Sequence, residues 1–305
     1  MPRPFRFGVS LIDAAPAAEW AAKCRRAEEL GYDVITVADH LGMPAPFPSL
    51  VAAAGATERP RLGTFVLNAG FWNPALLARE VATTDALTGG RLELGLGTGY
   101  VPAEHEAAGL PWGTARERVD HLLRTVEELE RLRGSDQLAR ATPRPGGATP
   151  GARPGEPPRV PLLIGANGDR MLRIAAEHAD IAAFTGARAR RNGALEPVTA
   201  TELDERVALY REAAAAREEP AELNLLIQIV SVTDNRSAAI GPWLPRIPRL
   251  TERQVLELPI VLVGTVEQIT EQVRAQRERY GFSYLTVLEP NLEAFAPVVR
   301  ALRGR

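Results

Sequence analysis

The chain has 305 residues, of which 45% are hydrophobic and 24% are charged, a composition typical of a globular protein with a large core and not of a disordered or fibrous one. Its 36 basic and 38 acidic side chains nearly cancel, so no strong positive field would attract nucleic acid or an anionic membrane surface. The one cysteine, Cys24, excludes an intrachain disulfide and a CxxC metal or redox site, which fits a reducing compartment.

The amino-terminal segment and the apolar runs carry no export or membrane signal. Only a short apolar run precedes Asp13, and no stretch reaches the roughly 18 apolar residues of a membrane span. We therefore expect a cytoplasmic protein without a membrane partner.

Short apolar runs alternate with helical stretches along the whole chain. The apolar runs lie at helix boundaries, as buried parallel strands do, and they cover residues 5–11, 33–38, 61–68, 91–96, 160–164, 180–184, 223–232 and 283–288. The helical stretches cover residues 16–30, 48–58, 74–88, 114–133, 168–178, 200–217, 265–280 and 291–302. Eight strand–helix units are the number that closes a barrel, whereas a doubly wound sheet needs fewer strands. The sequence therefore predicts an α/β fold, a single-domain (β/α)8 TIM barrel over residues 1–305 with insertions in its βα loops.

Two insertions interrupt this alternation. One is Pro/Gly-rich and lies at about 134–159, where ten of the sixteen residues 143–158 are Pro or Gly, a composition that supports neither a helix nor a central strand. It lies on the crossover between the fourth and fifth strands and fits either a flexible linker or an active-site lid. The second, at about 234–259, is irregular and contains four prolines and a short helix-like stretch.

Polar residues directly after the strands are the candidate functional residues, because the reactive groups of such barrels gather at the carboxyl ends of the strands. They are Asp39 and His40 after the second strand, Asn68 after the third, Thr98, Gly99, Tyr100, Glu104 and His105 after the fourth, and Gly165, Ala166, Asn167 and Gly168 after the fifth.

His40 is the candidate acid–base group. An imidazole can give or take a proton near neutrality, and a neighbouring carboxylate such as Asp39 can hold its tautomer. Consecutive side chains at a strand end point apart, so a structural hydrogen-bonding role at the barrel rim is the alternative. Glu104 and His105 form a similar but less fixed pair in a loop, and the other two histidines lie in predicted helices.

A small glycine-containing loop, GANG at 165–168, leads from the fifth strand into a helix. Its backbone N–H groups can face an anion such as a phosphate at the helix N-terminus; the alternative is a tight turn that only needs its glycines. The GLGTG run at 95–99 lacks the GxGxxG spacing, so an NAD site is not expected. GxSxG, HExxH and spaced acidic clusters do not occur, so we expect no metal site and a bound cofactor for the difficult chemistry.

Four blocks of the sequence resemble the luciferase-like monooxygenase superfamily. They are VADH (37–40), the run from LGTFVLN to GLPW (62–112), PLLIGANGDRMLRIAAEHADI (161–181) and VGTVEQITEQVRAQRERYGFSYLTVLE (263–289). The resemblance covers nearly the whole chain except 134–159 and 185–259, and it is closest to the actinobacterial oxidoreductases that use the deazaflavin F420. It implies a TIM-like barrel, usually dimeric, that holds a reduced flavin or deazaflavin at its carboxyl-terminal mouth.

The resemblance also implies roles for individual residues. Asp39 and His40 match positions beside the cofactor ring, with His40 as proton donor or electrostatic partner to the substrate. Phe65 and Val66 match a strand bulge where family members often carry a non-proline cis peptide bond that backs the ring. The other implied cofactor-binding residues are Asn68, and, in the segments matching the phosphate site, Thr98, Gly99, Gly165, Ala166, Asn167 and Gly168.

Two features depart from the sugar-phosphate dehydrogenases of that family. Tyr100 stands where those enzymes carry a glutamate, and a phenol with an ordinary pKa near 10 is a poor acid at neutral pH unless its pKa is shifted. The only lysine, Lys23, lies in the first predicted helix, so the lysines that those enzymes use on the substrate phosphate are missing. Glucose 6-phosphate is therefore not expected, and the sequence leaves the substrate open.

Three functions fit these residues. The first is an F420-dependent oxidoreductase that moves a hydride between the deazaflavin and a small organic substrate, with His40 handling the proton. The second is an FMNH2-dependent flavin monooxygenase, and the third is a non-catalytic flavin-binding protein. In each case we expect a homodimer that binds a small molecule.

Overall fold

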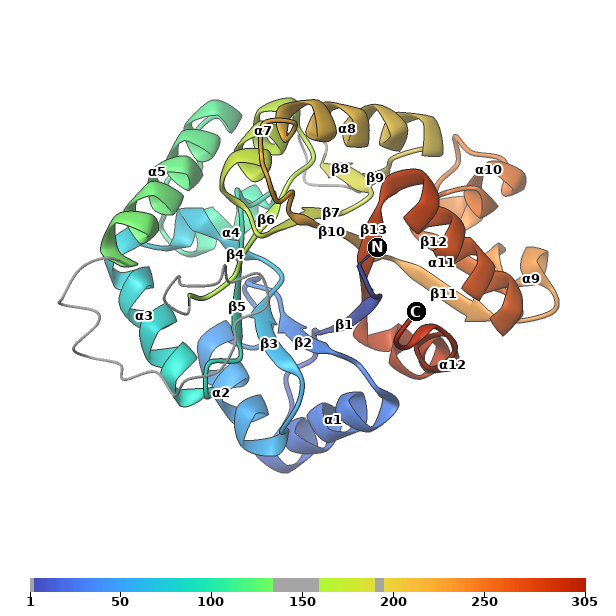
Figure 1. The fold of residues 1–305 in the computed structure, drawn as a ribbon, viewed down its shortest axis with the longest axis horizontal. Coiled ribbons are helices and arrows are strands. Elements are labelled where there is room, and N and C mark those ends of the chain that lie inside the picture. Colours follow the sequence, from blue (N-terminus) through green and yellow to red (C-terminus); the bar gives the residue numbers. More distant parts are fainter. Residues whose placement is uncertain (1–2, 134–158, 190–194) are drawn as a thin grey trace.

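The computed structural model describes residues 3–133, 159–189 and 195–305. Within them, eight parallel strands close into a barrel surrounded by helices (Figure 1). The barrel strands are β1 (Arg6–Leu11), β2 (Val34–Val37), β3 (Arg61–Thr64) continued by β4 (Leu67–Asn68), β5 (Leu92–Gly97), β6 (Leu162–Gly165), β7 (Ile181–Phe184), β10 (Glu222–Ile227) and β13 (Phe282–Leu288). The ring closes where β5 pairs with both β3 and β4. The predicted (β/α)8 TIM barrel is confirmed.

The helices that surround the barrel begin and end at residues suited to those positions. Asn73 caps α3 by accepting the N–H groups of Ala75 and Leu76 at 3.0 and 3.2 Å, and Gly31 ends α1 with a φ of 93°, a conformation that glycine adopts readily. The surrounding helices are α1 (Ala17–Leu30), α2 (Pro46–Ala56), α3 (Pro74–Leu87), α5 (Ala115–Arg133), α7 (Asp169–His178), α8 (Ala200–Ala213), α11 (Val266–Tyr280) and α12 (Leu292–Leu302).

Apolar side chains fill two concentric layers. The outer layer lies between strands and helices, where Phe7, Val9 and Leu11 of β1 are at most 1% exposed. The inner layer, inside the barrel, contains an apolar cluster of Val34, Phe65, Leu163, Ile181, Ala183, Leu226 and Tyr284, together with the buried, hydrogen-bonded Asn224 and Thr286. Because alternate residues of a strand face the two layers and both layers are largely apolar, the strands appear in the sequence as mostly apolar runs.

Two predicted strands are broken. The predicted strand 61–68 divides into β3 and β4, with the cis peptide bond Phe65–Val66 between them. The predicted strand 223–232 divides at Gln228, after which β11 (Ile229–Val232) leaves the barrel and pairs with β12 (Val261–Gly264). The sequence pattern misses β12 because four apolar residues directly before a helix cannot be distinguished from part of that helix.

Several short elements escape the pattern, since three to six residues are too few to display a period. They are α4 (Pro102–Ala107), the hairpin of β8 (Ala187–Ala189) and β9 (Leu195–Pro197), and the 3₁₀ turns Ala69–Phe71, Leu244–Arg246 and Glu289–Asn291. The insertion at about 234–259, which was expected to be irregular with a short helix-like stretch, contains two short helices, α9 (Arg236–Ile240) and α10 (Glu252–Leu256).

The Pro/Gly-rich insertion at about 134–159 lies, except for Arg159, outside the described residues. The chain enters it from the end of α5 and leaves it before β6, that is, at the amino-terminal end of the barrel strands.

Charged side chains close this amino-terminal end of the barrel. Arg6 lies between Glu93 at 2.5 Å and Glu222 at 2.6 Å, and Arg61 donates a second hydrogen bond to Glu93 at 2.7 Å. The guanidinium carbon of Arg6 is 4.7 Å from the ring centroid of Tyr284. Burial opposes the charge of Arg6, but the two carboxylates outweigh it and hold the pKa of Arg6 above its ordinary value.

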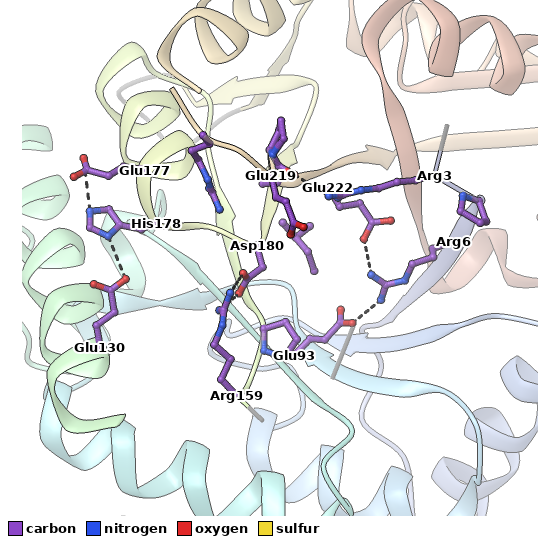
Figure 2. Close-up of a pocket in the computed structure, with 16 residues that line it drawn as sticks. Arg3, Arg6, Glu93, Glu130, Arg159, Glu177, His178, Asp180, Glu219 and Glu222 are labelled. Atoms are coloured by element: carbon purple, nitrogen blue, oxygen red, sulfur yellow. Dashed lines mark hydrogen bonds and ion pairs between the residues drawn. The ribbon is translucent and has the colours of Figure 1, made fainter. Parts of the chain in front are cut away.

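A cavity of about 550 Å³ adjoins this cluster (Figure 2). Charged groups line most of it, including the ion pair of Arg159 with Asp180 and His178 between Glu130 and Glu177. None of the predicted site residues lines this cavity; the predicted site residues lie toward the other end of the barrel strands.

Candidate functional site

The carboxyl-terminal mouth of the barrel brings together residues from β2, β4 and the segment after β5. His40 follows β2, Asn68 ends β4, Tyr100 follows β5, and α4 carries Glu104 and His105. Hydrogen bonds join His40 to Glu104 and to Tyr100, and Asn68 to His105. These residues are up to 65 positions apart in the sequence, and the fold unites them because parallel strands end at the same side of a barrel.

His40 lies between a carboxyl and a phenol. Its Nδ1 is 2.8 Å from Glu104 Oε1, and its Nε2 is 3.3 Å from Tyr100 Oη. A carboxylate can only accept a hydrogen bond, so Nδ1 carries the hydrogen and Nε2 of the neutral ring keeps its lone pair. The side chains of His40 and Glu104 are 22% and 16% exposed, which leaves the pair partly shielded yet reachable. The carboxyl partner of His40 is therefore Glu104 and not the adjacent Asp39.

Asp39 makes its contacts on another side. Its Oδ2 accepts hydrogen bonds from Trp72 Nε1 at 3.0 Å and from the backbone N–H of Asn68 at 3.2 Å. Burial raises the pKa of Asp39, and the hydrogen bonds from Trp72 and Asn68 together with nearby His40 only partly oppose this shift. Asp39 thus ties the loop after β2 to the loop after β4.

Asn68 and His105 form a buried polar unit. Asn68 Nδ2 donates to His105 Nε2 at 2.9 Å, and His105 Nδ1 donates to the carbonyl of Pro111 at 2.9 Å. Both nitrogens of His105 are occupied and the residue is 1% exposed, so it positions Asn68 and α4 and is not available for acid–base chemistry. Gly99 packs against this unit with a φ of 69°, and a Cβ there would come within 2.6 Å of the Asn68 side chain.

Val66 and three glycines form the floor of the mouth. The peptide bond Phe65–Val66 is cis, as the resemblance implies. A Cβ at Gly97 would lie 2.6 Å from Val66 Cγ2, one at Gly95 would lie 2.0 Å from the carbonyl oxygen of Thr64, and one at Gly165 would lie 3.7 Å from both methyl groups of Val66. Glycine at Gly95 and Gly97 is therefore required by the close approach of the neighbouring strand.

The loop after β6 leaves a helix N-terminus exposed. No side chain caps α7, whose first turn follows Gly168, and a Cβ at Gly168 would meet nothing within 4 Å. Asn167 exchanges hydrogen bonds with Thr185 at 2.8 and 3.0 Å, whereas Ala166 is buried. Asp169 in the first turn is paired with Arg206, which offsets its negative charge, so the uncapped N–H groups are suited to an anion.

The predicted site residues thus form two groups. One comprises Asp39, His40 and Asn68 with the partly buried Thr98 and Gly99, and the other is the segment 165–168. Strands β2 and β6 are three positions apart in the ring of eight, so a ligand lying across the mouth can meet both groups.

Two functional contacts were not accessible from the sequence pattern. Trp72, which fixes Asp39, lies in an irregular turn that carries no motif, and Glu104 was paired in the sequence with its neighbour His105 although it contacts His40. A helix of six residues turns Glu104 and His105 to different sides, and no spacing rule reveals which side faces His40.

Neither a metal cluster nor a membrane helix is found in the described ranges 3–133, 159–189 and 195–305. No group of three or more His, Cys, Asp or Glu side chains there could hold a metal ion. No helix among these residues is both long and apolar enough to cross a membrane.

Comparison with known sequences identifies a family and several relatives. The profile of the family described as luciferase-like monooxygenase matches residues 3–244. An F420-dependent glucose-6-phosphate dehydrogenase of Intrasporangium calvum is 38% identical over 168 residues, which are 51% of this chain and 50% of that protein. A 5,10-methylenetetrahydromethanopterin reductase of Methanolobus tindarius is 30% identical over 179 residues, 57% of this chain and 52% of that protein. The chain thus spans about half the length of the curated relatives it matches.

Solved structures share the fold over almost the whole chain. An F420-dependent secondary alcohol dehydrogenase in complex with an F420-acetone adduct superposes with a TM-score of 0.73 at 17% identity, covering 99% of this chain and 100% of that one. The coenzyme F420 dependent tetrahydromethanopterin reductase from Methanopyrus kandleri also gives 0.73 at 17% identity, with 98% of both chains covered. At such identities the likeness establishes the barrel and its connectivity.

Proposed function

The chain belongs to the luciferase-like monooxygenase family, and on this basis we propose that it is an oxidoreductase that transfers a hydride between the deazaflavin F420 and a small organic substrate. The observation that carries this proposal is the partly exposed, hydrogen-bonded pair of His40 with Glu104 at the carboxyl-terminal end of the barrel strands. At the same end of the barrel, β6 leads into the uncapped N-terminus of α7. The named relatives, which include F420-dependent dehydrogenases, support the choice of cofactor.

The residues present fit a planar ring that carries a phosphate-bearing tail. Gly97 and Gly165 leave Val66 as the apolar surface on which a ring can rest, and the uncapped N-terminus of α7 offers backbone N–H groups and the positive end of the helix dipole to a phosphate. Glycine at Gly168 keeps this end of the helix open.

In this proposal the cofactor-binding residues divide by chemistry. The residues that would hold the ring are Asp39, His40, Phe65, Val66 and Asn68, and those that would hold the phosphate are Thr98, Gly99, Gly165, Ala166, Asn167 and Gly168. When bound, the deazaflavin supplies a hydride donor or acceptor, which the side chains of the mouth do not.

His40 is the proposed proton-handling group. Its Nε2 lone pair can take a proton, and the Glu104 carboxylate on Nδ1 stabilises the imidazolium that results. Asp39 is proposed to hold Trp72 and the Asn68 backbone in place, so that the loops on both sides of His40 stay fixed.

Titration of the purified protein with F420 and, separately, with FMN tests the cofactor, with ligand fluorescence as the readout. We expect micromolar or tighter binding of F420, and bleaching or recovery of its absorbance only when a substrate is added. Binding of FMN without binding of F420 would replace the proposal by a flavin monooxygenase, and binding of either without turnover would favour a non-catalytic flavin-binding protein.

We also propose that the protein is a cytoplasmic homodimer. Leu76 and Leu87 of α3 are 52% and 62% exposed, and a second copy of the chain could cover these apolar side chains. The buried thiol of Cys24 suits a reducing compartment. Light scattering after size exclusion tests the dimer, and a monomer at every concentration would contradict it.

A further inference from the structure

The last barrel strand ends in a three-residue turn whose side chains reach both neighbouring strands. The 3₁₀ turn Glu289–Asn291 follows directly after β13, and β13 lies between β1 and β10 in the barrel (Figure 1). The first residue of the turn, Glu289, contacts the segment after β1, and its last residue, Asn291, contacts the segment after β10. The turn therefore links three adjacent strand ends at the carboxyl-terminal mouth.

Glu289 holds the backbone of the loop after β1. Its Oε2 accepts hydrogen bonds from the N–H groups of Ile12 at 2.7 Å and Asp13 at 3.0 Å. Two N–H groups beyond the end of the strand are thereby paired with a carboxylate. Because β1 pairs with β2 up to its last residue, Leu11, the loop that Glu289 holds begins beside the loop that carries His40.

Lys23, the only lysine of the chain, completes this contact from α1. Its Nζ lies 2.7 Å from Glu289 Oε1, and the two side chains are 23% and 13% exposed. Burial opposes the charge of Glu289, but the hydrogen bonds from Lys23 and from the loop outweigh it and keep the pKa of Glu289 below its ordinary value. The hydrogen bond to Glu289 likewise raises the pKa of Lys23, so both groups stay charged at neutral pH. The other groups that face this pair are the carboxylates of Asp13 and Glu19 and the buried thiol of Cys24.

Asn291 makes the matching contact on the other side of β13. Its Nδ2 donates a hydrogen bond to the carbonyl of Gln228 at 3.2 Å, and its Oδ1 accepts one from the N–H of Val230 at 3.3 Å. Gln228 is the residue between β10 and β11, where the chain leaves the barrel. One side-chain amide thus pairs a donor and an acceptor of the backbone at the point where the barrel pairing ends.

This side of the mouth supplies none of the residues proposed to hold the cofactor. Those residues come from the part of the barrel that runs from β2 to β6 and from the loops that follow these strands, whereas β1, β10 and β13 contribute none. The ends of these three strands are therefore available to cover a cofactor ring bound on the opposite side.

Resting on the proposed function, we infer that Glu289 and Asn291 are positioning residues of the mouth, and that Lys23 positions Glu289. These three side chains, called the clasp below, hold the loop after β1 and the break after β10 as a wall that shields the bound cofactor ring from water. The clasp itself takes no part in the chemistry. Because its hydrogen bonds exist before a ligand arrives, ligand binding does not have to bear the entropy cost of ordering these segments.

The hydrogen bonds of Glu289 can be followed without a cofactor. In full-length protein labelled with ¹⁵N-isoleucine, the amide signal of Ile12 is assigned by its loss in Ile12→Val. We expect Glu289→Gln to move the Ile12 amide proton, because a neutral amide is a weaker acceptor than a carboxylate. In the unchanged protein this signal should follow the protonation of Glu289 as the pH falls. Lys23→Met should raise the midpoint of that titration by about 1 to 3 pH units, the effect of removing an opposite charge at this distance.

Two variants control this measurement. Arg26 lies on the same helix as Lys23 and pairs with Glu293 on the exposed surface, so Arg26→Met should leave the Ile12 midpoint in place. Asp13→Asn removes the neighbouring carboxylate, and the titration must persist in it. An Ile12 signal that Glu289→Gln leaves unmoved, or a midpoint that is the same with and without Lys23, overturns the clasp.

The wall is tested on the F420-loaded protein by acrylamide quenching of F420 fluorescence. Glu289→Ala and Asn291→Ala should each increase the quenching, since a loosened wall lets acrylamide reach the ring, while the dissociation constant for F420 stays close to that of the unchanged protein. Glu289→Gln, which keeps an acceptor oxygen, should lie between Glu289→Ala and the unchanged protein. Arg26→Met should quench as the unchanged protein does.

The outcomes separate this inference from the function on which it rests. Absence of F420 binding to the unchanged protein overturns the proposed function and the shielding wall together, while the Ile12 titration still decides the hydrogen bonds of the clasp. If F420 binds but quenching is the same in Glu289→Ala and Asn291→Ala as in the unchanged protein, the positioning role is wrong and the proposed function stands. A large loss of F420 affinity in these variants would place cofactor-binding residues on this side and overturn the assignment of the wall.

Discussion

The two ends of the barrel use charged residues in opposite ways. At the amino-terminal end, Arg6 contacts two carboxylates and Glu93 contacts two guanidinium groups, so each charge is compensated by its neighbours. At the carboxyl-terminal mouth, Tyr100 is 37% exposed and α7 lacks a side-chain cap. Both ends are made from strand termini of the same eight strands, so the difference arises from side chains and loops and not from the backbone.

The comparison separates stability from function. Replacing one member of a compensated ion pair inside the barrel leaves the opposite charge buried and unpaired, which is unfavourable. The amino-terminal cluster therefore stabilises the fold. Partly satisfied groups at the mouth cost little stability because water can reach them, and they are the groups that a ligand can engage. Variants at the two ends should therefore affect different measurements.

His40→Ala should give the largest effect, and mainly on turnover. Loss of a positioned acid or base typically slows the chemical step about 10² to 10⁴-fold, whereas cofactor affinity should fall much less, because the other residues proposed to hold the ring remain. Turnover assays and F420 titration measure the two effects separately. His178→Gln is the control at the opposite end, where His178 lies between Glu130 and Glu177. Equal loss in both variants would remove the assigned role of His40.

Arg6→Met should give the converse result, a loss of stability with normal cofactor binding. The substitution leaves Glu222 without its cation and Glu93 with only Arg61, and breaking such a buried pair costs about 3 to 5 kcal/mol in the free energy of unfolding. Urea unfolding measures this change. Arg26→Met is the matched control, because Arg26 pairs with Glu293 on the exposed surface and its loss should barely matter. Similar stability of both variants would contradict the view that the cluster is structural.

Gly97→Ala should act at the mouth through shape. Its new methyl group would lie 2.6 Å from Val66 Cγ2 and push Val66 toward the space of the ring, and overpacking of this kind costs about 1 to 3 kcal/mol. The dissociation constant for F420 should rise about 10 to 100-fold if that cost falls on the bound state. Gly55→Ala in α2, where the methyl group meets nothing within 4 Å, should bind as the unchanged protein does. Unaltered binding by Gly97→Ala would mean that Val66 is not the floor of the cofactor site.

The barrel was predictable because each strand is a mostly apolar run, and the two breaks that the pattern missed are local. Gln228 lies within a run of apolar residues, so only the pairing of β11 with β12 shows that the chain has left the barrel there. Periodicity reports burial on both faces but not which strand is the neighbour.

The positions of the site residues were predictable and their partners were not. The rule that reactive groups follow the strands gave His40, Asn68 and Tyr100. It could not show that Glu104, 64 residues after His40, supplies the carboxylate, because that contact depends on how α4 turns in a loop. The sequence instead suggested Asp39, whose carboxylate is directed to Trp72.

Asp39→Asn should give the smallest effect, visible in how stability varies with pH. Burial raises the pKa of Asp39 above its ordinary 3.8, so the folded protein holds this proton more tightly than the unfolded chain. By linkage, the free energy of unfolding falls as the pH rises from 3.8, the ordinary pKa, to the raised pKa of Asp39 in the folded protein. Above the raised pKa, the ionised Asp39 makes a constant unfavourable contribution to stability. The asparagine oxygen can still accept the hydrogen bonds of Trp72 and Asn68 without a charge. Urea unfolding over this pH range should therefore show the variant gaining stability relative to the unchanged protein as the pH rises. If Asp39→Asn is less stable than the unchanged protein at neutral pH, the charge of the carboxylate, and not only its hydrogen bonds, holds the loops of the mouth together. Charge would then stabilise this end of the barrel as it does the amino-terminal end.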